Sequence, residues 1–166
     1  MSVDFITNLE KGMEKLHKRG AFLTVKSGEK VNTMTISWGS IGFIWGKPSL
    51  TALVRKSRFT HELIEKADSF TISIPYGEEM KAVLGICGTK SGRDIDKVAE
   101  AGIKFVPSNE VESPVVDGCN MYYECKIVYK QDMDESFVSP EVKERSYAKG
   151  DYHTMYYGEI VSCYEK

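Results

Sequence analysis

The chain has 166 residues, of which 42% are hydrophobic and 28% are charged. This length fits one folded domain, and the composition is that of an ordinary globular protein. A net charge of −2 and a pI near 6.0 argue against binding to nucleic acid or to an anionic membrane through bulk positive charge. We therefore expect a single domain over residues 1–166, with neither nucleic acid nor a membrane as a partner.

The N-terminal segment and the cysteines indicate a reducing compartment. The segment MSVDFITNLEKG lacks the basic stretch and apolar core of a signal peptide, and no apolar run is long enough to span a bilayer. None of the four cysteines forms a CxxC pair, and the chain has only three histidines. We expect a cytoplasmic protein with free thiols and no metal site.

The first half of the chain predicts one helix followed by a series of strands. Ile6, Leu9, Met13 and Leu16 recur at helical spacing, and Gly20 ends this helix. Residues 21–27 and 31–38 predict a hairpin that turns at residues 28–29. Further elements are expected as strands at residues 41–45, 50–54 and 69–74, and as a short helix at 60–67.

The second half predicts two helices and then mostly strands. The helices are expected at residues 78–86 and 94–101, separated by a loop, and the Ser91-x-x-Asp94 pattern marks the start of the second. Strands are expected at residues 115–116, 121–129 and 153–164, with a loop and a helical turn after Pro140 between the last two. Strands outnumber helices without a βαβ alternation, which favours a mainly β (α+β) fold: a closed or partly open antiparallel barrel with peripheral helices.

Two short basic segments could bind a phosphorylated ligand. The segment RKSRFT (residues 55–60) joins a predicted strand to a predicted helix, and TKSGR (residues 89–93) precedes another helix. A helix N-terminus offers unpaired N–H groups, and arginine offers paired donors to phosphate. The alternative interpretation of residues 55–60 is a solvated strand end in which Ser57 or Thr60 caps the helix. The sequence has no GxGxxG, GxxxxGK[ST] or GxSxG motif, which disfavours a Rossmann domain or a P-loop NTPase.

These segments belong to an ordered set of motifs: NTMTxSWG, KP, VRKSRxT, TKSGRDxDK and GEIV. In this order they resemble the flavin reductase-like, FMN-binding split-barrel family over about residues 21–161. The resemblance implies an FMN-binding split β-barrel with peripheral helices and a homodimer that binds FMN without a covalent bond near the subunit interface. The family includes NAD(P)H-dependent flavin reductases and electron carriers of the flavoredoxin type.

The resemblance also implies which residues bind the cofactor. The residues expected to line the flavin ring and ribityl chain are Asn32, Thr33, Met34, Thr35, Ser37 and Trp38. Those expected at the phosphate are Arg55, Ser57, Arg58 and Thr60, with Lys90 and Ser91 closing over it. His153 matches a histidine of the last strand, where it would assist nicotinamide or flavin, although the Gly-Asp-His of the family is here Gly-Asp-Tyr-His.

The strand that carries NTMTISWG has two interpretations. Alternation would place Asn32, Met34, Ile36 and Trp38 on one face and the hydroxyl residues between them on the other. A threonine-rich strand that ends in glycine can offer hydroxyl and backbone donors to the pyrimidine edge of a flavin. The simpler interpretation is a barrel strand with Trp38 in the core or at a subunit interface.

These observations predict a homodimeric, flavin-linked oxidoreductase that passes electrons from NAD(P)H through FMN to an acceptor. Two alternatives stay open: a flavoredoxin-type carrier fed by a redox protein, and a non-enzymatic flavin-binding protein. A second argument for the dimer comes from strands with apolar bulk on both faces, which need cover from a partner. The apolar bulk in these strands comes from Tyr122, Tyr123, Tyr156 and Tyr157.

Overall fold

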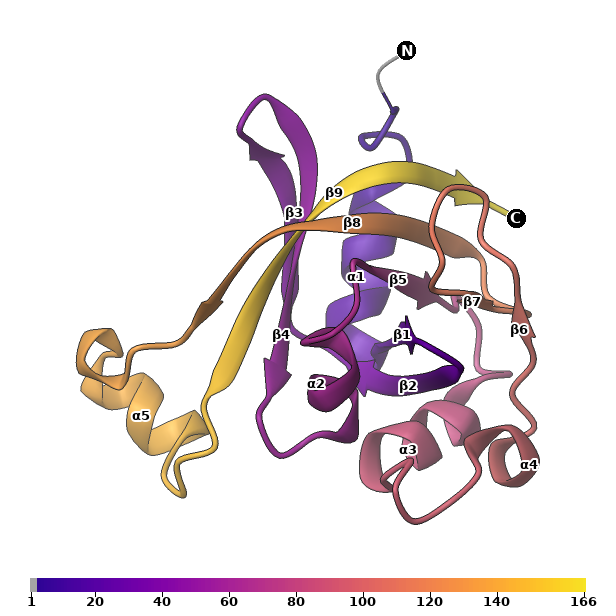
Figure 1. Cartoon of the computed structure of the whole chain (residues 1–166). Coiled ribbons are helices and arrows are strands. Elements are labelled where there is room, and N and C mark those ends of the chain that lie inside the picture. The colour runs from indigo at the N-terminus through magenta and orange to yellow at the C-terminus, as the bar shows by residue number, and fades with distance from the viewer. Residues whose placement is uncertain (1–2) are drawn as a thin grey trace.

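A seven-stranded antiparallel sheet forms most of the computed structural model, which describes residues 3–166 (Figure 1). The strand order is β2-β1-β5-β8-β9-β4-β3, and β6 and β7 form a separate pair. This architecture confirms the mainly β fold that the sequence predicts. The elements in chain order are α1 (Leu9–Arg19), β1 (Ala21–Ser27), β2 (Lys30–Ile36), β3 (Gly39–Ile44), β4 (Lys47–Arg55), α2 (Phe59–Ile64), β5 (Ser69–Ile74), α3 (Lys81–Thr89), α4 (Lys97–Ala101), β6 (Phe105–Val106), β7 (Val115–Val116), β8 (Met121–Asp132), a 3₁₀ turn η1 (Glu135–Phe137), α5 (Pro140–Ser146) and β9 (His153–Glu165).

The hairpin of β1 and β2 forms as predicted, with pairs running from Ala21 opposite Ile36 to Ser27 opposite Lys30. A second hairpin joins β3 to β4 through Trp45 and Gly46, whose φ angles are 57° and 69°. Positive φ at both central residues is the geometry of a type I′ turn, which matches the twist of antiparallel strands. In the predicted strand 41–45, residues 41–44 therefore belong to β3 and residue 45 is the first residue of this turn.

Three predicted helix starts are wrong, since α3 begins at Lys81 and not at residue 78, and α1 and α4 also begin later than predicted. α1 begins at Leu9, because Asn8 has a left-handed φ of 64° and Ile6 lies outside the helix with 61% of its surface exposed. α4 begins at Lys97, because Asp96 accepts the amides of Val98 and Ala99 at 3.0 and 3.3 Å. The hydroxyl of Ser91, which was predicted to cap this helix, instead accepts the amide of Arg93 at 3.1 Å within a turn. An Asp closer to the helical segment thus takes the cap position.

α3 extends to Thr89, three residues beyond its predicted end, so the segment TKSGR begins in a helix that it was expected to follow. The last carbonyls of α3 accept hydrogen bonds from side chains outside this helix. The guanidinium of Arg58 donates to the carbonyls of Gly88 and Cys87, and the ammonium of Lys97 donates to that of Cys87. These bonds satisfy the acceptors that a helix end leaves open.

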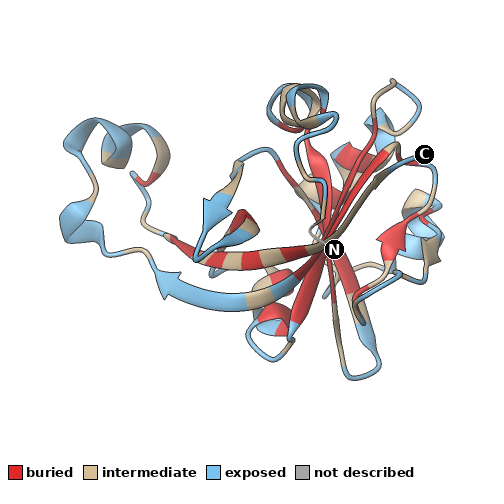
Figure 2. Cartoon of the chain, turned by 90° about the horizontal axis from the view of Figure 1, so that it is seen from above, coloured by how far each residue is buried: buried red, intermediate tan, exposed pale blue. Residues whose placement is uncertain are grey.

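The connection between β8 and β9 (residues 133–152), here called the arm, projects from the sheet. It carries η1 and α5, a longer helix than the single turn expected after Pro140. Figure 2 shows that buried residues concentrate in the sheet, whereas most of the arm is exposed. Within residues 3–166, none of the helices has the length and apolar character needed to cross a bilayer.

Three of the four tyrosines that were used to predict a dimer lie in the core of the single chain. Tyr122, Tyr123 and Tyr156 are at most 1% exposed. Other parts of the same chain cover these side chains, so they need no partner subunit. The prediction that their strands require cover from a second subunit is therefore wrong. Tyr157 is half-buried beside Trp45, with ring centroids 6.0 Å apart.

The curvature of the sheet brings β2 and β4 towards each other, although four other strands separate them in the strand order. The short helix α2 contacts β1, β2 and β4 and so bridges the two ends of the sheet. The barrel is split at this place, and the cavities described next lie along the split.

Candidate functional site

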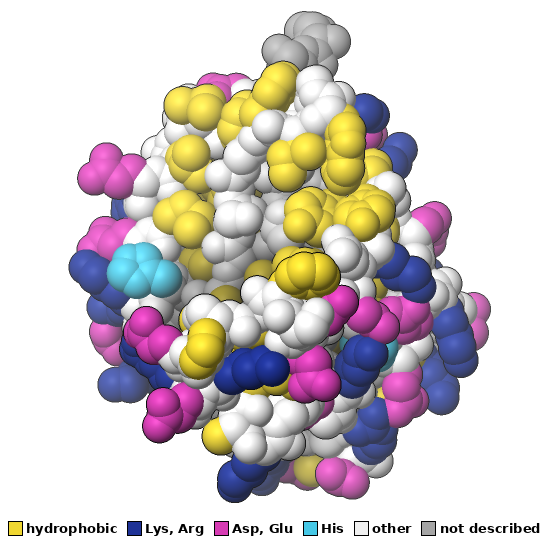
Figure 3. All heavy atoms as spheres, turned by 90° about the vertical axis from the view of Figure 1, so that its left-hand side faces the viewer, with side chains coloured by type: hydrophobic (Ala, Val, Ile, Leu, Met, Phe, Trp, Pro, Cys, Tyr) yellow, Lys and Arg dark blue, Asp and Glu magenta, His cyan; other side chains and the backbone are white. Residues whose placement is uncertain are grey.

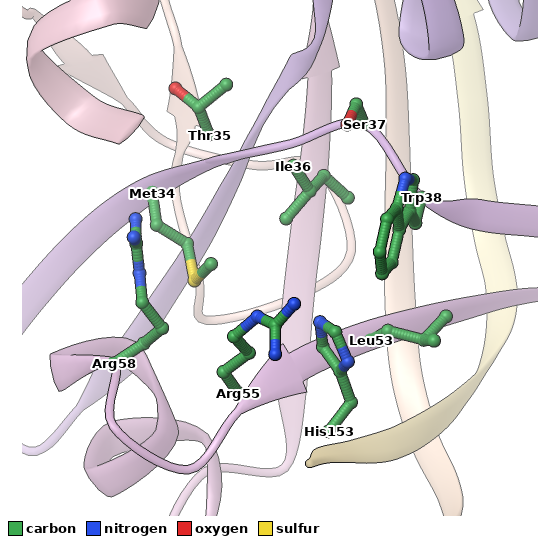
Figure 4. A pocket seen from close by; sticks show the side chains of 9 residues that line it. All are labelled: Met34, Thr35, Ile36, Ser37, Trp38, Leu53, Arg55, Arg58 and His153. Atoms are coloured by element: carbon green, nitrogen blue, oxygen red, sulfur yellow. The ribbon is translucent and has the colours of Figure 1, made fainter. Parts of the chain in front are cut away.

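A cavity of 180 Å³ lies between the end of β2 and the facing strands β4 and β9 (Figure 4). We call it the His153 cavity. Its lining residues are Met34, Thr35, Ile36, Ser37, Trp38, Leu53, Arg55, Arg58 and His153. Trp38 is 47% exposed and stands at one side of the opening, with its ring centroid 5.4 Å from that of His153. This position excludes the alternative that Trp38 belongs to the core.

His153 is held as a neutral imidazole in the wall of this cavity. Only 6% of its surface is exposed, and burial, with a smaller effect from the charge of Arg55, lowers its pKa to about 4. Its Nδ1 lies 2.6 Å from the hydroxyl of Tyr147. We assign this hydroxyl as the donor, because within residues 3–166 it has no other hydrogen-bond partner. The ring proton then lies on Nε2.

Arg55 fixes the arm against the site. Its guanidinium donates to the carbonyls of Asp151 at 2.8 Å and Ser146 at 3.1 Å, and it lies over the ring of Tyr147 at 5.2 Å. The side chain therefore lines the His153 cavity and not the second cavity described next, where the other predicted phosphate residues lie. The amide and hydroxyl of nearby Ser57 both bind the carboxylate of Asp151, at 3.1 and 2.6 Å, which adds a second attachment of the same loop.

A second cavity, of 110 Å³, adjoins the first, and we call it the cation cavity. Its lining residues are Asn32, Met34, Ser57, Arg58, Phe59, Thr60, Thr89, Lys90, Ser91, Gly92, Arg93 and Lys97. It thus brings together seven predicted site residues from three separate segments of the chain, which are Asn32, Met34, Ser57, Arg58, Thr60, Lys90 and Ser91. Among residues 3–166, four cations line it and no Asp or Glu does. Lys90 and Arg93 each pair with a glutamate outside the lining. Such a donor set suits an anion with several oxygens.

Arg58 and Met34 line both cavities and make them continuous. The guanidinium of Arg58 is half-buried and donates to the carbonyls of Gly88 and Cys87 at 3.0 and 3.3 Å. Burial lowers the pKa of this guanidinium, and nearby Asp151 partly offsets the effect. Two bonds leave further N–H donors of its five available to a ligand.

Close contact between residues 88–92 and β2 shapes the cation cavity. A Cβ atom at Gly92 would clash with the side-chain oxygen of Asn32 and lie 2.9 Å from the ring of Phe59. The amide of Asn32 in turn donates to the hydroxyl of Thr60 at 2.9 Å and so ties β2 to α2. Glycine at residue 92 thus lets the loop approach the strand.

One predicted residue lies away from both cavities. The hydroxyl of Thr33 is fully buried against β1, where it donates to the carbonyl of Leu23 at 3.1 Å and accepts from Thr24 at 2.9 Å. Seven lining residues were not among the predicted site residues, which are Ile36, Leu53, Phe59, Thr89, Gly92, Arg93 and Lys97. The signal for Lys97 was present in the TKSGRDxDK motif, which places a lysine shortly after the basic turn.

A sequence profile described as the flavin reductase like domain matches residues 13–166. The chain belongs to this family. Among related sequences, uncharacterized proteins from Archaeoglobus fulgidus and Pyrococcus abyssi are each 28% identical to it. The first match spans 149 residues, 90% of this chain and 73% of the relative; the second spans 153 residues, 91% and 76%.

Solved structures share the fold of this flavin reductase like domain. An FMN-binding domain of a flavin reductase-like enzyme from Shewanella baltica has a TM-score of 0.69 at 21% identity, covering 95% of this chain and 74% of that one. The flavoredoxin of Desulfovibrio vulgaris (Miyazaki F) has a TM-score of 0.69 at 24% identity, covering 89% and 69%. Nowhere in residues 3–166 of the domain do three or more His, Cys, Asp or Glu side chains gather as they would around a metal ion.

Proposed function

We propose that this flavin reductase like domain binds FMN across the His153 cavity and the cation cavity. The observation that carries the proposal is their continuity through Met34 and Arg58, with aromatic and apolar walls on one side and four cations on the other. FMN has a matching arrangement of groups, because a ribityl chain joins its flat aromatic ring to an anionic phosphate. The match to the family and the FMN-binding neighbours support the same cofactor.

At the ring end, the chain would position the flavin between Trp38 and the walls formed by Met34 and Leu53. His153, neutral and held by Tyr147, would direct its Nε2–H as a hydrogen-bond donor into the cavity. When bound, the flavin supplies the hydride and electron chemistry, and the protein supplies orientation and hydrogen bonds.

At the phosphate end, Arg58 would act as the central ligand, with Lys90 and Ser91 closing over the group. Lys90 is exposed and lies 3.6 Å from Glu100, so its ion pair is weak enough to exchange for a phosphate. We assign Arg55 to anchoring the arm beside the ring instead of to the phosphate, because its guanidinium already binds two carbonyls of the arm.

We further propose that the bound flavin passes electrons from NAD(P)H to an acceptor, such as free flavin or a redox protein. Neighbours with this fold include an NADH:FAD oxidoreductase from Streptomyces globisporus and a styrene monooxygenase flavin reductase from Pseudomonas putida. A flavoredoxin-type carrier that takes electrons from a redox protein is the alternative that the flavoredoxin neighbour favours.

Anaerobic stopped-flow mixing of the FMN-loaded protein with NADH and with NADPH separates these functions. Loss of the flavin absorption at a rate that rises with nucleotide concentration is the result expected of a reductase. Bleaching by reduced ferredoxin, but by neither nucleotide, would contradict reductase activity and leave the carrier. Bound flavin that no protein donor reduces would favour a storage role.

The site also gives a reason to propose a homodimer. Exposed apolar side chains gather on the face of the molecule that carries the β3–β4 hairpin and β8 (Figure 3), and they include Phe43, Ile44, Trp45, Val128 and Tyr129. A further hollow of 640 Å³ between the arm and the sheet adjoins the His153 cavity and shares Trp38 and Leu53 with it. A second copy on this face would cover the open side of the ring site.

A further inference from the structure

The hollow between the arm and the sheet offers room for a ligand beside the His153 cavity. Its volume is 640 Å³, which is within the range of small-molecule sites. We call it the arm hollow, because most of its lining residues belong to the arm. It shares Trp38 and Leu53 with the His153 cavity, so a ligand in the arm hollow would lie beside the proposed position of the flavin ring.

The walls of the arm hollow are mainly apolar and partly aromatic. The apolar and aromatic side chains that line it include Trp38, Leu53, Phe137, Val142, Tyr147 and Met155. Phe137 is 89% exposed and Val142 is 44% exposed. A flat apolar ligand in the arm hollow would remove part of this surface from water, and this would stabilise its binding.

The charge of the lining disfavours ligands that carry phosphate. Asp132 and Asp134 line the arm hollow, and within residues 3–166 no Lys or Arg does. Hydrogen bonds from Lys56 and Thr154 lower the pKa of Asp132. A hydrogen bond from Ser136 lowers the pKa of Asp134, so both carboxyls are ionised at neutral pH. Like charge would therefore repel flavin nucleotides and nicotinamide dinucleotides from the arm hollow, whereas an uncharged ligand would meet no such barrier.

The arm hollow also contains donors for carbonyl oxygens. The hydroxyl oxygen of Ser139 accepts the amide of Val142 at 3.4 Å, which leaves its O–H to donate. The side-chain oxygen of Gln131 accepts the hydroxyl of Tyr129 at 3.0 Å, which leaves its two N–H groups to donate. A flat, uncharged ring that carries carbonyl oxygens thus fits the walls, the charge and the donors together.

We propose that the arm hollow binds a neutral quinone, which the protein reduces to the hydroquinone. This inference rests on the proposed flavin site and names the acceptor of its electrons. The quinone would take two electrons and one hydrogen as a hydride from the reduced flavin, and the second hydrogen as a proton from water. The products are the hydroquinone and the oxidised flavin. NAD(P)H would then supply the next hydride and leave as NAD(P)⁺.

The test measures by equilibrium dialysis how tightly the oxidised, FMN-loaded protein binds 2,3-dimethyl-1,4-naphthoquinone. Methyl groups block both positions at which a free thiol such as Cys163 could add to this quinone. The unmodified protein should bind it at least tenfold more tightly than the analogue that has a carboxylate in place of one methyl group. Mixing the neutral quinone with the photoreduced protein without oxygen should restore the flavin absorption.

Val142→Trp would fill the arm hollow and should weaken binding of the neutral quinone by about tenfold or more. Glu144→Trp is the matched control, because Glu144 is exposed on the same helix but does not line the arm hollow, and it should leave quinone binding unchanged.

The other outcomes would each contradict a named part of the proposal. A protein that holds FMN but binds no quinone would overturn the quinone site and leave the flavin site standing. If Val142→Trp also shifts such a protein towards monomer, a second copy occupies the arm hollow instead. Equal binding of the two quinones, or binding that Val142→Trp does not change, would place the quinone elsewhere. Bound quinone that does not restore the flavin absorption would refute the reduction, whereas failure to bind FMN would refute the proposed function itself.

Discussion

In the described part of the chain, Arg58 is the one cation that lines both the His153 cavity and the cation cavity. Replacing it in Arg58→Ala should weaken FMN binding by about 1.5–3 kcal/mol, the usual cost of losing a charged hydrogen bond. Riboflavin lacks the phosphate and should bind as before. Fluorescence titration with both ligands measures the difference, and Arg145→Ala, which removes an exposed arginine of α5, is the control. Equal losses for FMN and riboflavin would refute the phosphate assignment.

His153 predicts a dependence of stability on pH. Its pKa is about 4 in the folded chain and about 6.5 in an unfolded one. Between these values the unfolded state binds more protons, so the free energy of unfolding falls as the pH falls, by about 1.4 kcal/mol per pH unit. The contribution is complete above about pH 6.5.

Urea unfolding of the unmodified protein and of His153→Gln between pH 7 and pH 4 tests this prediction. The variant has no titrating group at this position, so its free energy of unfolding should fall less steeply with decreasing pH. Parallel pH profiles for the two proteins would show that His153 titrates normally and is not held neutral by burial.

Arg55 and Arg58 show what the sequence could not decide at this scale. Both are arginines of the segment RKSRFT, and the family resemblance assigns both to the phosphate. In the structure, the carbonyls that bind Arg55 lie 91 and 96 residues away in the arm, whereas those that bind Arg58 lie 29 and 30 residues away in α3. Long-range contacts of this kind leave no local pattern in the sequence. The structure is therefore needed to distinguish Arg55, which binds the arm, from Arg58, which lines the cation cavity.

Among the helices and strands, the predictions were most accurate where neighbouring residues in the sequence determine the structure. The β1–β2 hairpin follows from two strand-like segments around Gly28, and its register confirms it. The start of α4 was missed because Ser91 and Asp96 are both cap-forming residues. The choice of Asp96 depends on the turn at residues 91–95, which packs beside β2 through Gly92.

The anchoring of the arm by Arg55 predicts a local change in dynamics. In Arg55→Ala the carbonyls of Ser146 and Asp151 lose their donor, and amide hydrogen exchange should accelerate in residues 146–152. Exchange in α1 and the sheet core should stay the same, because local opening need not involve the whole fold. Arg145→Ala, in the same arm, should leave exchange unchanged. Unaltered exchange at residues 146–152 in Arg55→Ala would remove the case for Arg55 as an anchor.

At the scale of the whole molecule, the apolar face around the β3–β4 hairpin predicts self-association. Phe43 is 63% exposed and Trp45 is 58% exposed. Analytical ultracentrifugation should show a dimer, and Phe43→Glu should shift it towards monomer, since a carboxylate in an apolar interface is costly. Val98→Glu changes an exposed apolar residue of α4, which lies away from this face (Figure 1), and should leave the dimer intact. A strictly monomeric protein that still binds one FMN per chain would contradict the dimer.

We propose above that FMN binds in one continuous site, which extends from Trp38 and His153 to Arg58 and Lys90. A crystal structure of the protein grown with FMN tests it most directly. We expect the flavin ring between Trp38 and Leu53, with the phosphate within hydrogen-bond distance of Arg58. A flavin bound elsewhere, or one whose phosphate points towards the arm and away from the cation cavity, would contradict it.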